Sequence, residues 1–354
     1  MKWKLVALCM LLPALCFART FNILKFGAHP DSLSNTKAIQ RAIDKAAAEG
    51  GGTVYIPKGT FKTGALFFKP ATKLKLAKDA VLLGSDDIND YPYGPSRIEG
   101  VSQPYYAALI NADGVDGFRI TGGGTIDGNG LKFWKAFWAR RAENPDCTNL
   151  EVSRPRLLFI QNAKHIKIKN VRLRNAGFWT THLYKCHFIE IENCDIRSPF
   201  EPIKAPSTDA IDLDVCSNVR IRNCYFSVND DAVTIKGGKG PYADALPENG
   251  MVENVVVQKC TFGRSHGCVT LGSECIHARN IEIKNCRFET DNITPLLRLK
   301  LRPDTPQKFE NISVQNCKGH VGKLIEVLPW KQFYDLKTKR NPCVQPSKIL
   351  LLKT

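Results

Sequence analysis

The sequence predicts an all-β fold: a single-stranded right-handed parallel β-helix with an N-terminal capping helix. A short strand pattern recurs along most of the chain, at intervals of 23, 30, 36, 26 and 31 residues. Turns rather than amphipathic helices separate the copies, which argues against leucine-rich and helical repeats. One amphipathic helix pattern precedes the copies, where the open end of a solenoid needs a cover.

The recurring unit broadly alternates apolar and polar residues, the period of a half-buried strand. Five copies end in cysteine: residues 189–194, 219–224, 255–260, 281–286 and 312–317. A sixth copy, residues 166–171, has Val171 in the cysteine position. Because parallel strands of successive coils stack about 4.8 Å apart, each position of the unit predicts a column of side chains.

Two of these columns are expected to serve packing. The cysteines should point inward as small buried residues. Asparagines just before the strands should form a ladder of side-chain amides at a turn; they are Asn218, Asn254, Asn280 and Asn311.

The N-terminal part predicts the cap. Residues 38–47 place Ala and Ile on one helical face, with Asn35 or Thr36 as the N-cap. Gly50–Gly52 end this helix, and Thr53 begins the first predicted strand. The repeat fades after residue 339, so residues 19–354 are expected to form one β-helix catalytic domain whose last coils are incomplete.

Residues 1–18 have the three parts of a secretory signal peptide: a short basic start, an apolar run over residues 5–17, and Ala18 before the expected cleavage. The apolar run is too short for a membrane span, which needs about 20 residues. We therefore expect a secreted or periplasmic protein without membrane insertion.

Thirteen cysteines are present, and eleven remain after this cleavage, an odd number spread over a long chain. Disulfide-rich secreted scaffolds crowd their cysteines into fewer than about 80 residues. The chain has no Cys-x-x-Cys pair and no Cys/His cluster with zinc spacing. Neither a disulfide framework nor a zinc site is predicted.

The charge points to an anionic partner. The chain has 50 Lys and Arg against 34 Asp and Glu, a formal net charge of +16, which becomes 48 − 34 = +14 once Lys2 and Lys4 are removed. Such a surface attracts nucleic acid, anionic lipid or an acidic polysaccharide. Secretion favours the polysaccharide, and no nucleic-acid-binding motif accompanies the charge.

A second strand of each coil brings polar residues together. The copies begin at Asp209, Asp231, Gly267 and Pro295. With Ile211, Val233, Val269 and Leu297 inward, two columns face outward: Asp212, Thr234, Thr270 and Arg298, then Asp214, Lys236, Gly272 and Lys300. Asp230 lies beside Asp231, and His266 lies one coil further on.

In this arrangement the carboxylates of Asp209, Asp230 and Asp231 lie close together on adjacent coils and cannot all ionise freely, so the pKa of at least one should rise. Carboxyl pairs with separated pKa values act as acid and base in glycoside hydrolysis. Inversion needs about 6.5–9.5 Å between them and retention about 5–5.5 Å; adjacent coils allow either. Arg298 and Lys300 are suited to a substrate carboxylate.

Four motifs carry a resemblance to a known family: residues 207–209 (Ser-Thr-Asp), 230–231 (Asp-Asp), 265–267 (Ser-His-Gly) and 298–300 (Arg-Leu-Lys). They resemble the Asn-Thr-Asp, Asp-Asp, Gly-His-Gly and Arg-Ile-Lys signature of the polygalacturonase family, glycoside hydrolase family 28, whose fold is a pectin-lyase-like solenoid. Bacterial exo-acting and rhamnogalacturonan-active members are the most similar. Ser207 and Ser265 depart from the signature, which leaves the substrate more open than the chemistry.

The resemblance implies inverting hydrolysis of α-linked galacturonic acid in pectin, without metal or cofactor. It implies Asp230 as the general acid, Asp209 and Asp231 as holders of the water, and His266 as support for the acid's protonation. Arg298 and Lys300 would bind the galacturonate carboxylate. Second-tier anion contacts are expected from Lys236, Lys239 and Arg302.

The stretch Gly237–Gly250 lengthens one coil after the Asp pair. We expect it to wall one end of the cleft and to favour exo action. Tyr242, Trp330 and Tyr334 could stack on sugar rings or pack internally, and the sequence leaves both roles open.

Other functions remain open at this stage. Within the family, the alternative is a rhamnogalacturonan hydrolase or galacturonidase. Outside it, the alternatives are a calcium-dependent pectate lyase and a non-catalytic polysaccharide-binding β-helix, because the fold alone does not imply hydrolysis. In each case the expected partner is an acidic polysaccharide, and a monomer is expected.

Overall fold

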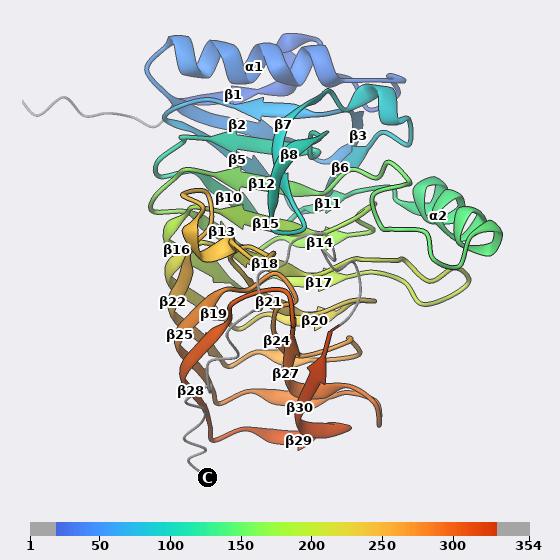
Figure 1. Cartoon of the computed structure of the whole chain (residues 1–354). Coiled ribbons are helices and arrows are strands. Elements are labelled where there is room, and N and C mark those ends of the chain that lie inside the picture. Colours follow the sequence, from blue (N-terminus) through green and yellow to red (C-terminus); the bar gives the residue numbers. More distant parts are fainter. Residues whose placement is uncertain (1–18, 331–354) are drawn as a thin grey trace, which may run out of the picture.

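The computed structural model of the chain describes residues 19–330, which form a parallel β-helix with three long sheets (Figure 1). The predicted all-β solenoid is confirmed. The predicted signal peptide (residues 1–18) and the predicted fading of the last coils (after residue 339) lie outside the described residues.

The first sheet has ten parallel strands and contains the recurring unit. Its strands, in spatial order, are β1 (Thr20–Asn22), β2 (Gly52–Ile56), β5 (Thr72–Leu76), β10 (Arg119–Gly122), β13 (Lys167–Lys169), β16 (His187–Glu192), β19 (Ser217–Arg222), β22 (Met251–Gln258), β25 (His277–Lys284) and β28 (Lys308–Gln315). Ile189, Val219, Val255, Ile281 and Ile312 are partners across these strands, which confirms the alignment of the repeat.

The second sheet has nine parallel strands, most of them three residues long. Its strands are β3 (Gly59–Thr63), β6 (Ala80–Gly84), β11 (Thr125–Asp127), β14 (Arg172–Arg174), β17 (Asp195–Arg197), β20 (Tyr225–Ser227), β23 (Thr261–Phe262), β26 (Arg287–Glu289) and β29 (Lys318–His320). Phe226, Phe262 and Phe288 stack inside it with ring centroids 5.2 and 5.3 Å apart. Aromatic stacking therefore fills this side of the core.

The third sheet also has nine parallel strands. They are β4 (Leu66–Phe68), β9 (Ile110–Asp113), β12 (Leu158–Gln161), β15 (Thr181–Tyr184), β18 (Ile211–Asp214), β21 (Val233–Lys236), β24 (Val269–Leu271), β27 (Pro295–Leu301) and β30 (Lys323–Pro329). Ile211, Val233, Val269 and Leu297 pair in register and are fully buried, so the predicted inward column is confirmed.

Both predicted packing columns are present. Cys194, Cys224, Cys260 and Cys286 are buried free thiols, and their sulfurs donate to backbone carbonyls of the preceding coil. The amide of Asn254 donates to Asn218, Asn280 to Asn254 and Asn311 to Asn280, at 3.3, 2.9 and 3.0 Å. These asparagines lie inside the long strands, not before them as predicted. Each takes a left-handed φ of 53–57° at a bend within its strand.

The capping helix is α1 (Thr36–Ala48), and its buried face includes Ile39, Ala42 and Ile43. Asn35 is the N-cap residue, but its side chain accepts from the backbone N–H of His29 at 2.7 Å rather than from the helix. The prediction that the first strand begins at Thr53 is wrong. β1 precedes the helix and pairs with β2, and its three residues are too few to show a period.

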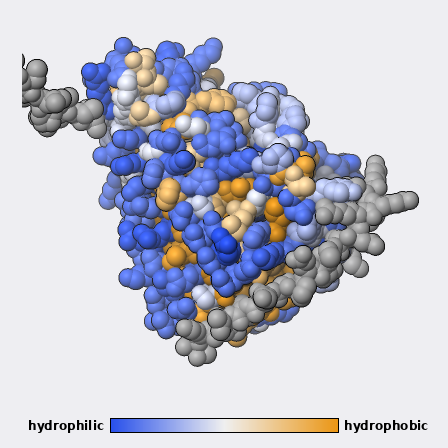
Figure 2. Space-filling view, turned by 60° about the vertical axis from the view of Figure 1, so that its left-hand side comes forward, coloured by the Kyte–Doolittle hydropathy of each residue, from blue (hydrophilic) through white to orange (hydrophobic). Residues whose placement is uncertain are grey.

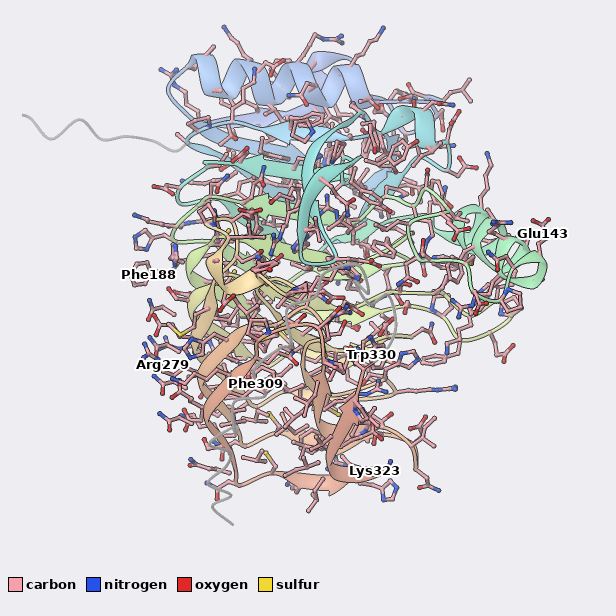
Figure 3. The ribbon with its side chains drawn as sticks, in the orientation of Figure 1. Glu143, Phe188, Arg279, Phe309, Lys323 and Trp330 are labelled. Carbon is pink, nitrogen blue, oxygen red and sulfur yellow. The ribbon has the colours of Figure 1, made fainter. Side chains whose placement is uncertain are left out.

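Two elements not foreseen from the sequence lie outside the solenoid. One is the antiparallel hairpin of β7 (Tyr93–Ile98) and β8 (Val101–Tyr106). The other is α2 (Leu131–Glu143), which projects to one side with Glu143 at its end (Figures 1 and 3). Three short 3-10 turns complete the structure: η1 (Ile23–Phe26), η2 (Ile88–Asp90) and η3 (Ala243–Ala245). Over residues 19–330, no helix combines the length and the hydropathy that a membrane crossing requires.

The outer surface of the solenoid is rich in paired charges. Hydrophilic side chains cover most of the face in Figure 2, with apolar patches between them. On the first sheet, Lys169 bridges Glu190 at 2.7 Å and Glu192 at 3.0 Å, and Arg279, which points outward in Figure 3, pairs with Glu253. These exposed pairs contribute solubility more than stability.

The asparagine ladder provides a test of coil stacking. Asn280→Ala removes two amide hydrogen bonds and places an alanine at φ 57°. We expect the free energy of unfolding to fall by about 2 kcal/mol. Asn280→Gly loses the same bonds without the backbone strain and should be less destabilised in urea denaturation. An alanine variant as stable as the wild type would contradict a structural role for the ladder.

Candidate active site

A cavity of about 570 Å³ opens over the third sheet, on the side away from the solenoid core. Its volume lies in the range of ligand pockets, on the order of 300–1,000 Å³. Six of the predicted site residues line it: Asp209, Lys236, Asp230, His266, Arg298 and Lys300. The register of four successive coils thus brings together side chains that are up to 91 residues apart in the sequence.

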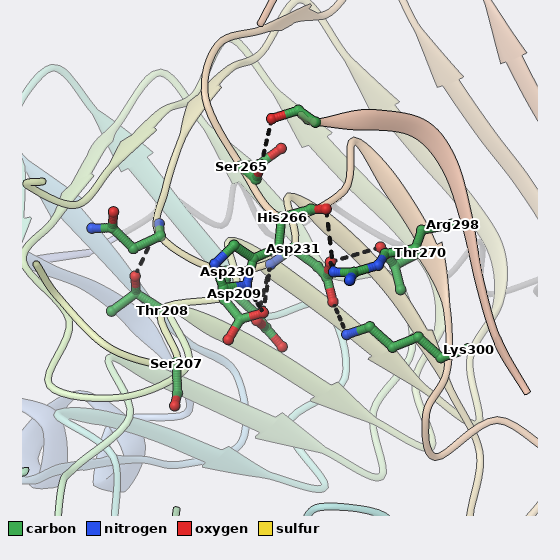
Figure 4. A network of polar contacts seen from close by, with 12 residues as sticks. Ser207, Thr208, Asp209, Asp230, Asp231, Ser265, His266, Thr270, Arg298 and Lys300 are labelled. Carbon is green, nitrogen blue, oxygen red and sulfur yellow. Dashed lines mark hydrogen bonds and ion pairs between the residues drawn. The ribbon is translucent and has the colours of Figure 1, made fainter. Parts of the chain in front are cut away.

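The three predicted carboxylates form one cluster (Figure 4). One oxygen from each of Asp209, Asp230 and Asp231 lies within 4.8 Å of the others. The backbone N–H of Asp231 donates to Asp209 Oδ1 at 3.2 Å and to Asp230 Oδ1 at 3.0 Å. One amide therefore holds two carboxyl groups side by side.

Asp231 lies beneath the cavity rather than in its wall, with 1% of its area exposed. Lys300 Nζ donates to Asp231 Oδ2 at 2.5 Å, and Thr270 Oγ1 donates to Oδ1 at 2.8 Å. Arg298 Nη1 is 3.8 Å from the same Oδ1. A buried carboxylate is stable only with such compensation, so Asp231 anchors both predicted substrate-binding cations.

His266 is held against the carboxylate cluster. Its Nδ1 is 3.2 Å from Asp230 Oδ1, and its backbone N–H donates to the Asp230 carbonyl at 2.9 Å. On its other side, His266 Nε2 is 3.4 Å from Lys204 Nζ. The imidazole thus contacts the carboxyl that is expected to be the acid, but, against the effect of burial, it lowers the pKa of Asp230 rather than favouring its protonated form.

Burial and neighbouring charges shift the pKa values of Asp209 and Asp230 in opposite directions. Burial raises the pKa of Asp209 well above its ordinary value, and the nearby charges of Asp230 and Asp212 raise it further, against the opposing effect of Lys236. Burial also acts to raise the pKa of Asp230, but His266 and then Lys300 outweigh it, and the net shift is downward. Because the two carboxyls lie within 4.8 Å of each other, the charge of one affects the titration of the other.

Asp212 belongs to the same buried group of carboxyls, although the sequence indicated no catalytic role for it. It is fully buried, and neither oxygen has a hydrogen-bond partner within residues 19–330. Burial raises the pKa of Asp212 to about 7, partly offset by Lys236, whose Nζ is 3.4 Å away.

The predicted anion contacts Lys236, Arg302 and Lys239 differ from Arg298 and Lys300. Lys236 lines the cavity, but its Nζ is 3.7 Å from Asp209, 3.4 Å from Asp212 and 3.1 Å from Glu274, so three carboxylates neutralise it. Arg302 does not reach this cavity, and its predicted substrate contact is not supported. β27 ends at Leu301, and the buried Arg302 forms a fork on Asp304 at 2.8 and 2.6 Å.

The stretch Gly237–Gly250 does not line this cavity, contrary to the prediction that it would wall the cleft. It packs outside: the Tyr184 hydroxyl donates to the carbonyl of Glu248 at 2.8 Å. Its link to the site is indirect. Lys239 Nζ lies 3.7 Å from the carboxylate of Glu99, which does line the cavity.

Several lining residues come from the unforeseen elements. Glu99 sits at the hairpin turn, where Glu99 and Gly100 have φ values of 48° and 72°, as in a two-residue turn of the primed kind. Trp138 and Arg141 come from α2, and Lys204 from the segment before the Ser-Thr-Asp motif. The glycine after Glu99 could have indicated a turn, whereas the other three residues lie outside any repeat and no sequence pattern marked them.

Three arginines near the hairpin and α2 are almost fully buried: Arg97, Arg154 and Arg156. Arg97 Nε donates to Asp214 Oδ2 at 2.9 Å, and Arg156 Nη1 is 2.7 Å from Nδ1 of the buried His182. Burial lowers the pKa of His182 to about 4. Arg154 lies between the rings of Phe137 and Phe178, at 4.3 and 4.4 Å. These contacts fix the hairpin and α2 onto the third sheet.

The three clustered aspartates are the described residues that could offer oxygens to a metal. Calcium takes 6–8 oxygens. Here Lys300 and Thr270 already occupy Asp231, and Lys236 lies beside Asp209. Cations and a hydroxyl thus already occupy the positions beside these carboxyl oxygens that a divalent ion would need.

Comparison with known proteins agrees with this geometry. The family described as "Glycosyl hydrolases family 28" matches residues 53–321, and "Rhamnogalacturonase A/epimerase, pectate lyase-like" matches residues 20–85. A probable polygalacturonase of Vitis vinifera is 33% identical over 273 residues, 73% of this chain and 52% of the relative. An exo-poly-alpha-D-galacturonosidase of Dickeya chrysanthemi is 29% identical over 303 residues, 72% of this chain and 48% of the relative. The chain spans about half the length of these curated relatives.

Among solved structures, a hyperthermoactive exopolygalacturonase from Thermotoga maritima superposes with a TM-score of 0.71 and 22% identity, covering 87% of this chain and 79% of that one. This likeness confirms the predicted right-handed parallel β-helix.

The buried carboxyl of Asp212 predicts a pH-dependent stability. Its pKa is about 7 in the folded chain and about 3.9 when unfolded. The stability that comes from its raised pKa is therefore present below about pH 4 and lost as the pH rises to about 7. Asp212→Asn has no such proton to lose.

We expect the variant to gain about 1–3 kcal/mol over the wild type between about pH 4 and pH 8, with part of the gain offset by burial of an amide at a position without hydrogen-bond partners. Urea denaturation across this range measures the difference, and Asp146→Asn, at an exposed position, is the control. A difference that does not depend on pH would contradict the raised pKa.

Proposed function

The chain belongs to glycosyl hydrolases family 28, and from this premise we propose that it hydrolyses α-linked galacturonic acid bonds in pectin, as a polygalacturonase-like enzyme. The observation that carries the proposal is the joint presence, in one cavity, of the carboxylate cluster, His266 and two cations suited to a uronate. The partner is accordingly an acidic polysaccharide. We also propose that the chain acts as a monomer and is secreted or periplasmic.

In this proposal Asp230 is the general acid. It is the most exposed carboxyl of the cluster, with 25% of its side chain accessible beside His266. Its pKa is low in the free protein because His266 and Lys300 favour the ionised form over the effect of burial. A bound uronate would engage the nearby cations and expel water, and both changes raise the affinity of Asp230 for the proton held on Asp209.

Asp209 and Asp231 would hold the attacking water. A water that donates to two oxygens at about 2.8 Å spans roughly 4.5 Å between them, which the spacing within 4.8 Å allows. Each carboxylate oxygen has two lone pairs, so Asp231 can still accept a bond while Lys300 and Thr270 hold it. The proposed acid Asp230 also lies within 4.8 Å of both water-holding carboxyls, which is shorter than the roughly 6.5–9.5 Å between acid and base in common inverting enzymes. The proposed inversion therefore depends on a water held by Asp209 and Asp231.

Arg298 and Lys300 would bind the galacturonate carboxylate. Both line the cavity, and Trp330 lies beside them, 5.7 Å from the Arg298 guanidinium and 4.8 Å from the Lys300 ammonium. An aromatic ring next to a cation suits a sugar whose one edge is apolar and whose other edge is charged. Trp330 is thus a proposed platform, whereas Tyr242 does not line this cavity.

Exo action is proposed from the hairpin. Arg97 of β7 is fixed to Asp214 of β18, so the hairpin lies over the sheet beside Asp209, and Glu99 at its turn forms part of the cavity wall. Asn149 donates to Glu99 at 3.1 Å and holds it there. An obstructed groove favours chain ends over internal bonds.

Asp230→Asn tests the acid. We expect kcat on polygalacturonate to fall about 10³-fold, because the amide cannot protonate the leaving oxygen. Reducing-sugar release measures the loss, and the thermal midpoint should stay close to that of the wild type. Asp146→Asn should retain full activity. An Asp230→Asn enzyme with near wild-type kcat would remove Asp230 from the acid role.

Product analysis separates the remaining functions. On polygalacturonate we expect monogalacturonate from the first time point, no ultraviolet-absorbing double bond, and no effect of a calcium chelator. Early mixed oligomers would indicate endo action, and chelator-sensitive unsaturated products would indicate a lyase. Cleavage only of rhamnogalacturonan would support the family alternative. Binding without any product would support a non-catalytic polysaccharide-binding β-helix.

A further inference from the structure

Arg141 and Lys204 differ from the other cations that line the cavity. Arg298 is paired with Glu326 at 3.0 Å, Lys300 with Asp231, and Lys236 with three carboxylates. Arg141 and Lys204 line the same cavity, yet within residues 19–330 neither has a carboxylate within 4 Å. Their charge is therefore available to an anion that enters from solvent.

The fold holds these two residues on one wall. Trp138 of α2 donates through its indole N–H to the backbone carbonyl of Lys204 at 2.7 Å, which ties the helix to the segment before the Ser-Thr-Asp motif. Arg141 follows Trp138 by three residues and so lies on the same helix surface. All three residues line the cavity, and Trp138 keeps 36% of its area exposed.

This wall adjoins the reacting groups. Lys204 Nζ is 3.4 Å from His266 Nε2, and His266 Nδ1 is 3.2 Å from Asp230. One imidazole ring thus separates Lys204 from the proposed acid. Arg298 and Lys300 contact the cluster directly through Asp231, whereas Lys204 approaches it only through His266.

We propose that Arg141 and Lys204 form a second carboxylate subsite, which binds the uronate of a sugar adjacent to the one held by Arg298 and Lys300. The proposal rests on the proposed function and narrows its substrate. Consecutive sugars must both be acidic to fill the two subsites, so homogalacturonan is the preferred polymer. A backbone that alternates uronate with a neutral sugar would offer a carboxylate to only one of the two cation pairs and would therefore bind with fewer charge-assisted contacts.

Trp138 completes the subsite. Its exposed ring lies between the helix and Lys204, where it offers an apolar surface to a sugar ring whose carboxylate reaches the neighbouring cations. The guanidinium of Arg141 presents a planar fork that suits a carboxylate, and the Lys204 ammonium adds a point charge. Charge and stacking together would distinguish a uronate from a neutral hexose.

The test is binding, measured without turnover. In the full chain carrying Asp230→Asn, calorimetry compares Kd values for trigalacturonate after adding Lys204→Met or Arg141→Gln. Each change should weaken binding about ten-fold, because it removes one charge-assisted contact. Lys204→Arg should restore most of the affinity. Lys135→Met, an exposed lysine of the same helix that does not line the cavity, should leave Kd unchanged.

A carboxyl-reduced trisaccharide should show no difference between these proteins. Unchanged Kd for trigalacturonate in both variants, or an equal loss for the reduced sugar, would overturn the subsite. The outcome is separate from that of the proposed function, because Kd is measured in a variant that does not turn over. Loss of affinity in the variants supports the subsite even if the wild type proves not to hydrolyse the polymer.

Discussion

In-register stacking of coils is the constraint on which the rest of this structure depends. Each residue of a parallel strand pairs with one residue in the next coil, so a side chain is placed by its column as much as by its local sequence. The inward column of Ile211, Val233, Val269 and Leu297 is fully buried and holds the register of the third sheet. A slip of one residue would turn that column outward and scatter the active site.

The same constraint makes the site electrostatically demanding. Stacking places Asp209 and Asp231 one coil apart, and both side chains are almost fully buried. Buried carboxylates need partners, and the columns provide them: Lys300 for Asp231, and Lys236 for Asp209 and Asp212. Much of the cavity's positive charge therefore stabilises the protein's own acids. The large net charge of the chain consequently says little about substrate binding until paired and unpaired cations are separated.

Repetition decided what could be predicted from sequence. Columns allowed the core, the ladder of asparagines and the convergence of Asp209, Asp230, His266 and Arg298 to be predicted, because each follows from register. The predicted substrate contact of Arg302 is not supported because the inward and outward alternation of side chains holds only within a strand, and β27 ends at Leu301. The hairpin and α2 belong to no repeat, and their contacts to the sheet run through single buried arginines such as Arg97. Lys204 could not be recognised from the sequence. It stands out because no carboxylate of residues 19–330 lies within 4 Å of it, and only the structure shows this.

The position of the proton links binding to chemistry in the proposed mechanism. In the proposed mechanism the proton starts on Asp209, whose pKa is raised by burial, while His266 and Lys300 lower the pKa of Asp230 against the effect of its burial. An anionic sugar that engages those cations would weaken their effect on Asp230 and favour transfer of the proton from the carboxyl of Asp209 to that of Asp230, since one oxygen of each lies within 4.8 Å of the other. A neutral sugar would leave the cations unchanged and Asp230 ionised. Preference for uronate would then depend on more than binding affinity, because the charge of the substrate favours protonation of Asp230.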